Sequence, residues 1–431
     1  MVTNGPGQRG ESIVVTGIGI STSLGFGAEK NWERLLAGES AIAVRPAEEF
    51  PLPLKLPVRL GAAIPRDELA GRIRSAVPRA IWNTSEEVCH LWLLTASEAL
   101  DQAGVTEEGG PPAERVGIFV GTGAGPTHFT EREFVNIFTA KKAIHRDVSR
   151  MAVSKYMSSS LAGNLSLLKG LRGPSMSLNT ACSSGATAMV TALDALRLGR
   201  VDCAVAGGVD MPMVGTVLKG FYKISALTTQ TALGPRASRP FDAQRDGMVL
   251  GEGAGCLVLE RESVASARGR SPLAVLNGGA AISEAHHLLS PKDNGQDMAQ
   301  TMRLALDDAG MEPARIAHVY AHGTGTFYND ACEAAALDGV LHHRPTVSAT
   351  KAQLGHTIGG AAAIDAALAV LSLARGQVVP MVHLNQLDQE CPILPARKIA
   401  HRRLGPGKDG AVLVNAFAFG GHNTSLVFSA A

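Results

Sequence analysis

Short apolar runs alternate with helix-length stretches rich in alanine and leucine along the whole chain. The apolar runs have the length of buried strands and are bounded by turn residues. Strands are predicted at 12–20, 116–121, 176–179, 201–207, 256–260, 273–277, 316–321, 346–349, 411–415 and 425–428. Helices are predicted at 86–102, 186–198, 295–308 and 360–374. This alternation predicts an α/β fold with a largely parallel sheet covered by helices.

Two segments of the chain share one layout. Residues 174–198 form an apolar strand, a turn of small residues with Cys182 and an alanine-rich helix, and residues 345–374 repeat this order with His356 in the turn. Duplicated units bring equivalent strand ends together, and sites in open α/β sheets lie beyond the carboxyl ends of strands. The repeat therefore predicts that Cys182 and His356 lie in one crevice.

A charged stretch at 260–270 marks the predicted boundary between two halves. The N-terminal half, 1–269, would contain the cysteine, and the C-terminal half, 270–431, would contain the histidines. The segment 211–251 has many turn residues, so we expect it to run over the surface.

The composition fits a compact α/β enzyme. A chain of 431 residues is long enough for a substantial core. It is 45% hydrophobic and 18% charged, as is usual for a globular protein. A formal charge of +1 gives no reason to expect nucleic acid or an anionic membrane as partner. No apolar run reaches the ~18–20 residues that cross a bilayer, and the first ten residues lack a signal-peptide core. We expect a cytoplasmic protein.

Cys182 differs from the other cysteines in its surroundings. The six cysteines contain no C-x-x-C pair, which argues against a disulfide framework or a metal site. Cys182 lies in the turn Thr180-Ala-Cys-Ser-Ser-Gly185, directly before a helix. The unpaired N–H groups and the dipole of a helix start favour thiolate over thiol. The pattern predicts a nucleophile; a buried structural cysteine is the alternative.

Two histidines lie in glycine-containing turns of the C-terminal half. His322 ends an apolar strand in Ala321-His-Gly-Thr-Gly-Thr326, and His356 follows Lys351 by five residues. We expect Lys351 to pair with Glu333 and to stiffen the site. A satisfied histidine at a strand end and an ordinary surface lysine are the alternatives.

The last turn, Asn415-Ala-Phe-Ala-Phe-Gly-Gly-His-Asn423, follows a strand near the C-terminus. Such a turn presents a backbone N–H to an oxyanion while its phenylalanines exclude water; a simple hairpin turn is the alternative. A cysteine protease would use one histidine and would not need duplicated units. We therefore rank that class well below an enzyme that handles acyl groups with one cysteine and two histidines.

In their order and spacing, these four motifs resemble the β-ketoacyl synthases of the thiolase superfamily, in the Cys-His-His branch of the elongating type. The stretches 14–20, 170–174, 206–208 and 239–253 agree with the same family. The resemblance covers essentially the whole chain. It implies a thiolase-like fold, in which two duplicated βαβαβ-type halves form a layered α-β-α-β-α structure, and an acyltransferase activity.

The resemblance also implies a mechanism. Cys182 would take an acyl chain from an acyl carrier protein as a thioester. His322 and His356 would hydrogen-bond the thioester carbonyl of malonyl-carrier protein as CO2 leaves, and the resulting enolate would attack the acyl-enzyme. No metal or redox cofactor is implied, because the substrates are held on the phosphopantetheine of the carrier.

The remaining residues receive supporting roles from the same resemblance. The backbone N–H groups of Cys182 and Phe419 would form an oxyanion hole, and Lys351 and Glu333 would organise the histidines. The substrate-binding residues implied are Thr324 and Thr326 for the pantetheine arm, Phe417, Phe419 and Ala124 for the acyl pocket, and Ser290 beside the arm.

The chain departs from the usual family pattern at Ala124, Leu289, Phe327, Asp365 and His422. None of these changes removes a catalytic group, but together they favour type II polyketide or polyene biosynthesis over primary fatty-acid synthesis, which is the alternative. A non-catalytic chain-length factor lacks the nucleophile, so Cys182 speaks against that class. The resemblance implies a dimer, either a homodimer or a heterodimer with a ketosynthase-like chain-length factor.

Overall fold

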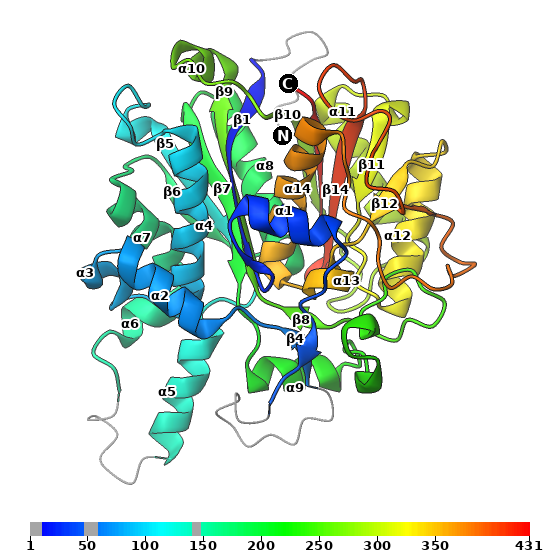
Figure 1. Ribbon diagram of the computed structural model, residues 1–431, viewed down its shortest axis with the longest axis horizontal. Coiled ribbons are helices and arrows are strands. Elements are labelled where there is room, and N and C mark those ends of the chain that lie inside the picture. The colour runs from blue at the N-terminus through cyan, green and yellow to red at the C-terminus, as the bar shows by residue number, and fades with distance from the viewer. Residues whose placement is uncertain (1–10, 47–58, 140–147) are drawn as a thin grey trace.

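Two sets of five strands repeat one topology in the computed structural model, which describes residues 11–46, 59–139 and 148–431 (Figure 1). The first set has the order β6-β5-β7-β9-β1 and the second has β12-β11-β14-β15-β10. In each set the first three strands are parallel, and the fourth is antiparallel to both its neighbours. This repeat confirms the duplicated halves predicted from the sequence. The prediction of a largely parallel sheet is wrong, because β9, β1, β10 and β15 pair antiparallel with all their neighbours in the strand order.

The strand bounds follow the predicted runs, usually with longer ends. They are β1 (Ile13–Thr22), β5 (Val116–Gly121), β6 (Ser175–Leu178), β7 (Cys203–Asp210), β9 (Gly253–Arg261), β10 (Ala274–Ser283), β11 (Ile316–Tyr320), β12 (Thr346–Ser348), β14 (Ala411–Ala418) and β15 (His422–Ser429). Minor strands are β2 (Gly25–Phe26), β3 (Ala43–Val44), β4 (Leu60–Ala62), β8 (Leu250–Gly251) and β13 (Leu394–Pro395).

Helices fill three layers around the two strand sets (Figure 1). Between the sets lie α8 (Ser184–Arg197), which packs on β5, β7, β10 and β15, and α14 (Ala361–Arg375), which packs on β7, β9 and β14. On the outer faces, α4 (Glu87–Ala103) covers β1 and β9, and α11 (Gln296–Ala309) covers β10 and β15. This is the expected α-β-α-β-α order.

The other described helices surround this frame. They are α1 (Ala28–Leu36), α2 (Arg66–Ala76), α3 (Arg79–Trp82), α5 (Thr127–Thr139), α6 (Ala152–Tyr156), α7 (Ser160–Lys169), α9 (Gly215–Lys223), α10 (Glu262–Ala267), α12 (Phe327–Val340) and α13 (Lys351–Leu354). The predicted division at 269/270 falls between α10 and β10 and stays a prediction.

The segment 358–375, which contains α14, is long and apolar enough to cross a membrane, but 89% of it is buried inside the fold. A helix that is apolar on all sides is expected where it packs between two sheets. We therefore identify α14 as a core helix.

The segment 211–251 runs over the surface only in part. Residues 216–236 are mostly exposed or half-buried, but residues 237–242 and 247–251 are buried, so the prediction is wrong for these two stretches. Phe241 is fully buried, and Asp242 is 1% exposed. Buried carboxylates bind the turn backbone: Asp242 Oδ2 accepts from the N–H groups of Asn385 and Gln386, and Asp330 Oδ2 accepts from that of Phe241. Turn residues can therefore be buried here because their polar groups have partners.

Close contact between the central helices and the first sheet depends on glycine. A Cβ atom at Gly208 of β7 would lie 2.2 Å from the carbonyl oxygen of Gly359 and 2.8 Å from Cα of Gly185. Backbone atoms cannot yield at such distances without moving the helices. Gly208 thus lets β7 lie close to both the start of α8 and the turn before α14.

We predict that Gly208→Ala destabilises the protein by about 3 kcal/mol or more, because it overpacks a rigid backbone crossing. Gly163→Ala in α7 is the matched control, since nothing lies within 4 Å of the added carbon; it should be neutral or stabilise by up to ~1 kcal/mol. Urea unfolding of both variants measures the difference. Equal midpoints would contradict the close-approach argument.

Candidate active site

Cys182 lies in a strained turn between β6 and α8. Ala181, directly before it, has φ 52°, a left-handed conformation that residues other than glycine seldom adopt. Polar side chains hold this turn: Asn179 Oδ1 accepts from the N–H of Ala181 at 3.1 Å, and Ser184 Oγ accepts from that of Thr180 at 2.9 Å. The local sequence therefore fixes the direction of the cysteine.

The turn that contains His356 repeats this strain in the second half. Ile358 has φ 47°, and its N–H donates to Nδ1 of His356 at 3.2 Å. A nitrogen that accepts a hydrogen bond bears no proton, so the neutral ring has its proton on Nε2. That Nε2 atom is buried and has no partner in the described residues. It is a hydrogen-bond donor available to a substrate.

His322 is positioned by a carboxylate that binds its backbone. Glu333 of α12 accepts from the N–H groups of His322 and Gly323, each at 2.8 Å. Burial raises the pKa of Glu333 to about 7, while these backbone donors lower it. Glu333 thus fixes the turn that follows β11.

The structure brings the three predicted catalytic side chains together. Ligating atoms of Cys182, His322 and His356 all lie within 4.8 Å of one another, and the two imidazole centroids are 5.2 Å apart with the rings nearly perpendicular. Burial, followed by the charge of Lys351, lowers the pKa of both histidines well below its usual range. Both rings are therefore neutral at physiological pH and can donate a hydrogen bond without a charge.

The thiol of Cys182 differs from the thiolate predicted from its helix start. Burial raises its pKa to about 12, although Lys351 and the backbone N–H groups of Phe419 and Cys182 lower it. The prediction of a resting thiolate is wrong because desolvation of the charged sulfur outweighs the local dipoles. The backbone N–H groups of Cys182 and Phe419 nevertheless lie close enough to the sulfur to lower this pKa.

We expected Lys351 to pair with Glu333, but its ion-pair partner is Asp365. Its ammonium nitrogen lies 3.8 Å from Oδ2 of Asp365, a residue of α14, and both atoms are buried. Asp365 also accepts from the hydroxyl of Thr350 at 2.6 Å. This ion pair connects the turn that follows β12 to α14. It also keeps a positive charge near the sulfur of Cys182 and the two imidazole rings.

Asp210 was missed by the sequence analysis although it joins the two halves at the site. Its carboxylate accepts from the N–H groups of Gly123 and Gly359, each at 2.7 Å, and from the hydroxyl of Thr122 at 2.6 Å. An acid directly at the end of the apolar run 203–209 was the signal that we did not use. It links the turn after β5 with the turn that follows His356.

The predicted aromatic residues line the site. The ring of Phe417 lies 6.3 Å from that of His322, and Phe419 stacks on Phe221 of α9 with centroids 6.1 Å apart. Cys182 itself packs with Met213, Met248 and Ile358 in an apolar cluster. These side chains exclude water from the sulfur.

The predicted polar contact residues range from buried Thr324 through half-buried Thr326 to exposed Ser290. Thr324 and Thr326 follow His322, and their hydroxyls share a hydrogen bond of 2.8 Å. Ser290 is exposed in a loop next to the last turn, where the carbonyl of Leu288 accepts from the N–H of Gly420 at 2.7 Å. The structure therefore places the hydroxyls beside the histidine turn and Ser290 farther out, on the surface.

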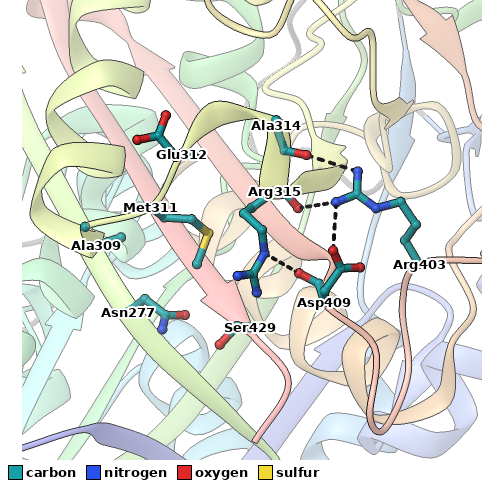
Figure 2. Close-up of a pocket in the computed structure, with 10 residues that line it drawn as sticks. Asn277, Ala309, Met311, Glu312, Ala314, Arg315, Arg403, Asp409 and Ser429 are labelled. Carbon is teal, nitrogen blue, oxygen red and sulfur yellow. Dashed lines mark hydrogen bonds and ion pairs between the residues drawn. The ribbon is translucent and has the colours of Figure 1, made fainter.

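Two cavities lie apart from the cysteine. One, of about 880 Å³, is lined mostly by apolar residues of α5 and α6 and includes Ala124, whose N–H is bound by Asp210. The other, of about 550 Å³, lies at the opposite end of β11, where Arg315 donates to the carbonyl of Asp409 and Arg403 donates to that of Ala314 (Figure 2). Only the first is next to the catalytic turns.

A buried thiol and two neutral imidazoles between duplicated α/β halves define a condensing acyltransferase of the thiolase fold. Models of the β-ketoacyl synthase N-terminal and C-terminal domains match residues 10–265 and 273–385. A 3-oxoacyl-[acyl-carrier-protein] synthase 2 of Rhizobium meliloti is 33% identical over 423 residues, covering 96% of this chain and 98% of the relative. The chain belongs to the β-ketoacyl synthase family.

Solved structures agree with this assignment. The ishigamide ketosynthase/chain length factor matches with a TM-score of 0.86 and 29% identity over 98% of this chain and 100% of that one. A type II polyketide ketosynthase solved with its acyl-carrier protein and a hexaketide has a TM-score of 0.87 at 22% identity, with coverage of 98% and 100%, and shows the fold alone. The expected fold and the acyltransferase class are confirmed.

We predict that alkylation of Cys182 by iodoacetamide is slow at pH 7 and rises roughly tenfold per pH unit up to pH 9, because the thiol stays protonated in this range. Lys351→Met should slow it further at each pH, since the ammonium lowers the pKa of the thiol. Peptide mass spectrometry separates Cys182 from the partly exposed Cys332. A rate independent of pH above 7 would show a thiolate.

Proposed function

We propose that this protein catalyses the decarboxylative Claisen condensation of an acyl chain on Cys182 with malonyl-acyl carrier protein, which gives β-ketoacyl-carrier protein and CO2. The observation that supports this most strongly is the grouping of one thiol with two neutral imidazoles. The sulfur of Cys182 and one ring nitrogen each of His322 and His356 all lie within 4.8 Å of one another. A single thioester can contact all three.

In the first step, the sulfur of Cys182 attacks the carbonyl of the acyl thioester. The negative oxygen of the tetrahedral intermediate accepts from the N–H groups of Cys182 and Phe419, and the thiol proton passes to the departing carrier sulfur. The high pKa of Cys182 makes the free thiolate rare, so the proton must leave as the sulfur–carbon bond forms.

In the second step, the thioester oxygen of malonyl-carrier protein accepts from His322 and His356 while the carbon–carbon bond to the carboxylate breaks. The electron pair forms an enolate, whose negative oxygen these donors stabilise in a site without water. The enolate carbon then attacks the carbonyl carbon of the acyl-enzyme, and the carbon–sulfur bond breaks. Cys182 leaves as thiolate and takes up one proton from solvent, which the overall decarboxylative condensation consumes. Neutral donors supply the stabilisation, so we propose no metal and no cofactor beyond the carrier's phosphopantetheine.

The remaining site residues support these steps in the proposal. Glu333 and Lys351 position the histidine turns, Thr324, Thr326 and Ser290 contact the arm, and Phe417 and Phe419 border the acyl chain. We propose that the chain extends past Ala124 into the apolar cavity of about 880 Å³.

For the pathway, we propose type II polyketide or polyene biosynthesis. Support comes from the small residue Ala124 next to this large cavity and from the likeness to the ishigamide ketosynthase/chain length factor. Primary fatty-acid synthesis is the second candidate, favoured by the names of the curated relatives. We propose a cytoplasmic protein that binds an acyl carrier protein and forms a homodimer or a heterodimer with a chain-length factor.

We predict that His356→Asn keeps acylation of Cys182 but lowers condensation by about 100-fold or more, because one oxyanion donor of the decarboxylation step is lost. Intact-protein mass spectrometry measures acylation and release of ¹⁴CO2 from labelled malonyl-carrier protein measures condensation. His286→Asn, at an exposed position, is the matched control. Cys182→Ala should abolish acylation; acylation of that variant would remove the nucleophile from the proposal.

We predict that Ala124→Phe lowers kcat/KM for long acyl donors at least about tenfold relative to short ones, because the larger ring fills the neck of the cavity. A series of acyl-carrier donors of increasing length, saturated and unsaturated, measures this ratio. Ala314→Phe, in the remote cavity of Figure 2, should leave the ratio unchanged. Wild-type preference for saturated long chains alone would favour fatty-acid synthesis.

A further inference from the structure

Arg239 is a buried arginine with an unused hydrogen-bonding edge. It is 3% exposed, and its Nε and Nη2 atoms are buried without a partner in the described residues. Its one recorded side-chain contact is a long one, from Nη1 to Oε1 of Gln244 at 3.5 Å. No described carboxylate forms an ion pair with it.

Other arginines of this protein show what such a group normally binds. Arg245, also buried, has Asp388 and the carbonyls of Asp242, Thr326 and Phe327 as partners. Arg115 uses the same Nε/Nη2 edge that is free in Arg239, and it holds both carboxylate oxygens of Asp202 at 2.9 and 2.8 Å. The free edge therefore has the geometry of a bidentate oxyanion site.

A buried guanidinium without a counter-ion is energetically costly, because it has lost its hydration and gained no opposite charge. An arginine cannot relieve this cost by losing its proton. A ligand with two oxygens on one centre, such as a phosphate or a carboxylate, would satisfy both N–H groups and the charge.

The backbone of Arg239 lies against the turn that follows His322. A Cβ atom at Gly325 would be 3.8 Å from the backbone nitrogen of Arg239, and the N–H of Gly247 donates to the carbonyl of Gly325 at 3.0 Å. Arg239 is therefore in the wall behind Thr324 and Thr326.

We propose that Arg239, whose backbone lies beside the Thr324–Thr326 turn, binds an oxyanion, a phosphate or carboxylate group, through its Nε/Nη2 edge. Entry of the anion requires a local shift of the loop that contains Arg239, because both atoms are shielded from solvent. Binding of an oxyanion does not depend on the proposed function; its assignment to the phosphate of a carrier arm rests on that function.

The first experiment uses inorganic phosphate as probe and the thermal unfolding of the full chain as readout. At constant ionic strength, replacing chloride by phosphate should raise the Tm of the wild type by about 2 °C or more beyond the general effect of this salt. Arg239→Met should show only the general effect. Arg315→Met, which removes an exposed arginine from the cavity of Figure 2, is the matched control and should keep the wild-type response.

The same variants distinguish an anion site from a structural arginine. Without phosphate, Arg239→Met should be at least as stable as the wild type, because a buried unpaired charge is replaced by an apolar chain. A less stable Arg239→Met that still responds to phosphate like the wild type would overturn the proposal. If this variant fails to fold, Arg239→Lys retains the charge without the bidentate edge, and an unchanged phosphate response in it would overturn the proposal equally.

The source of the oxyanion is decided by kinetics with two acyl donors. Arg239→Met should raise the KM for a phosphopantetheine thioester about tenfold at unchanged kcat, and leave the KM for an N-acetylcysteamine thioester, which lacks the phosphate, unchanged. If the variant and the wild type have the same KM for the phosphopantetheine thioester and also the same KM for the N-acetylcysteamine thioester, the phosphate of the arm is rejected as the ligand. A free oxyanion would then be the ligand. A wild type without turnover would refute the proposed function, while the phosphate-dependent Tm would still test the site.

Discussion

Desolvation of a thiol and two imidazoles in one shared cleft is the constraint on which the rest of this structure depends. Burial removes the charged form of each group: it raises the pKa of Cys182 and lowers that of His322 and His356. The site therefore contains neutral donors and a protonated nucleophile. Such a site stabilises negative charge only where and when a reaction creates it, which is the requirement for condensation through an enolate.

The fold supplies the supports that a dry polar site needs. The catalytic turns of the two halves meet because glycine permits the backbones near Gly208 and Gly359 to touch. Asp210 then joins the turns by hydrogen bonds to backbone N–H groups, and Glu333 holds the His322 turn in the same manner. Asp365 instead forms an ion pair with the ammonium group of Lys351. Buried carboxylates here bind backbone and lysine, while Nε2 of His356 stays available to a substrate.

Strained conformations at two equivalent positions link the duplication to the chemistry. Ala181 and Ile358 both adopt φ near 50° in the turns before α8 and α14. The first directs the sulfur and the second directs an N–H to Nδ1 of His356, which fixes the position of the imidazole proton. The same turn geometry thus positions the proposed nucleophile in one half and the proposed donor in the other.

The sequence by itself determined the strands, the central helices, the duplication and which cysteine and histidines meet at the candidate site, because periodicity and small-residue turns are local properties of the chain. Only the tertiary structure decided the partner of Lys351, the protonation of Cys182, the burial of residues 237–242 and the unpaired edge of Arg239. Each of these depends on which groups from distant segments replace water around a charge. That balance between desolvation and new partners exists only after the chain has folded.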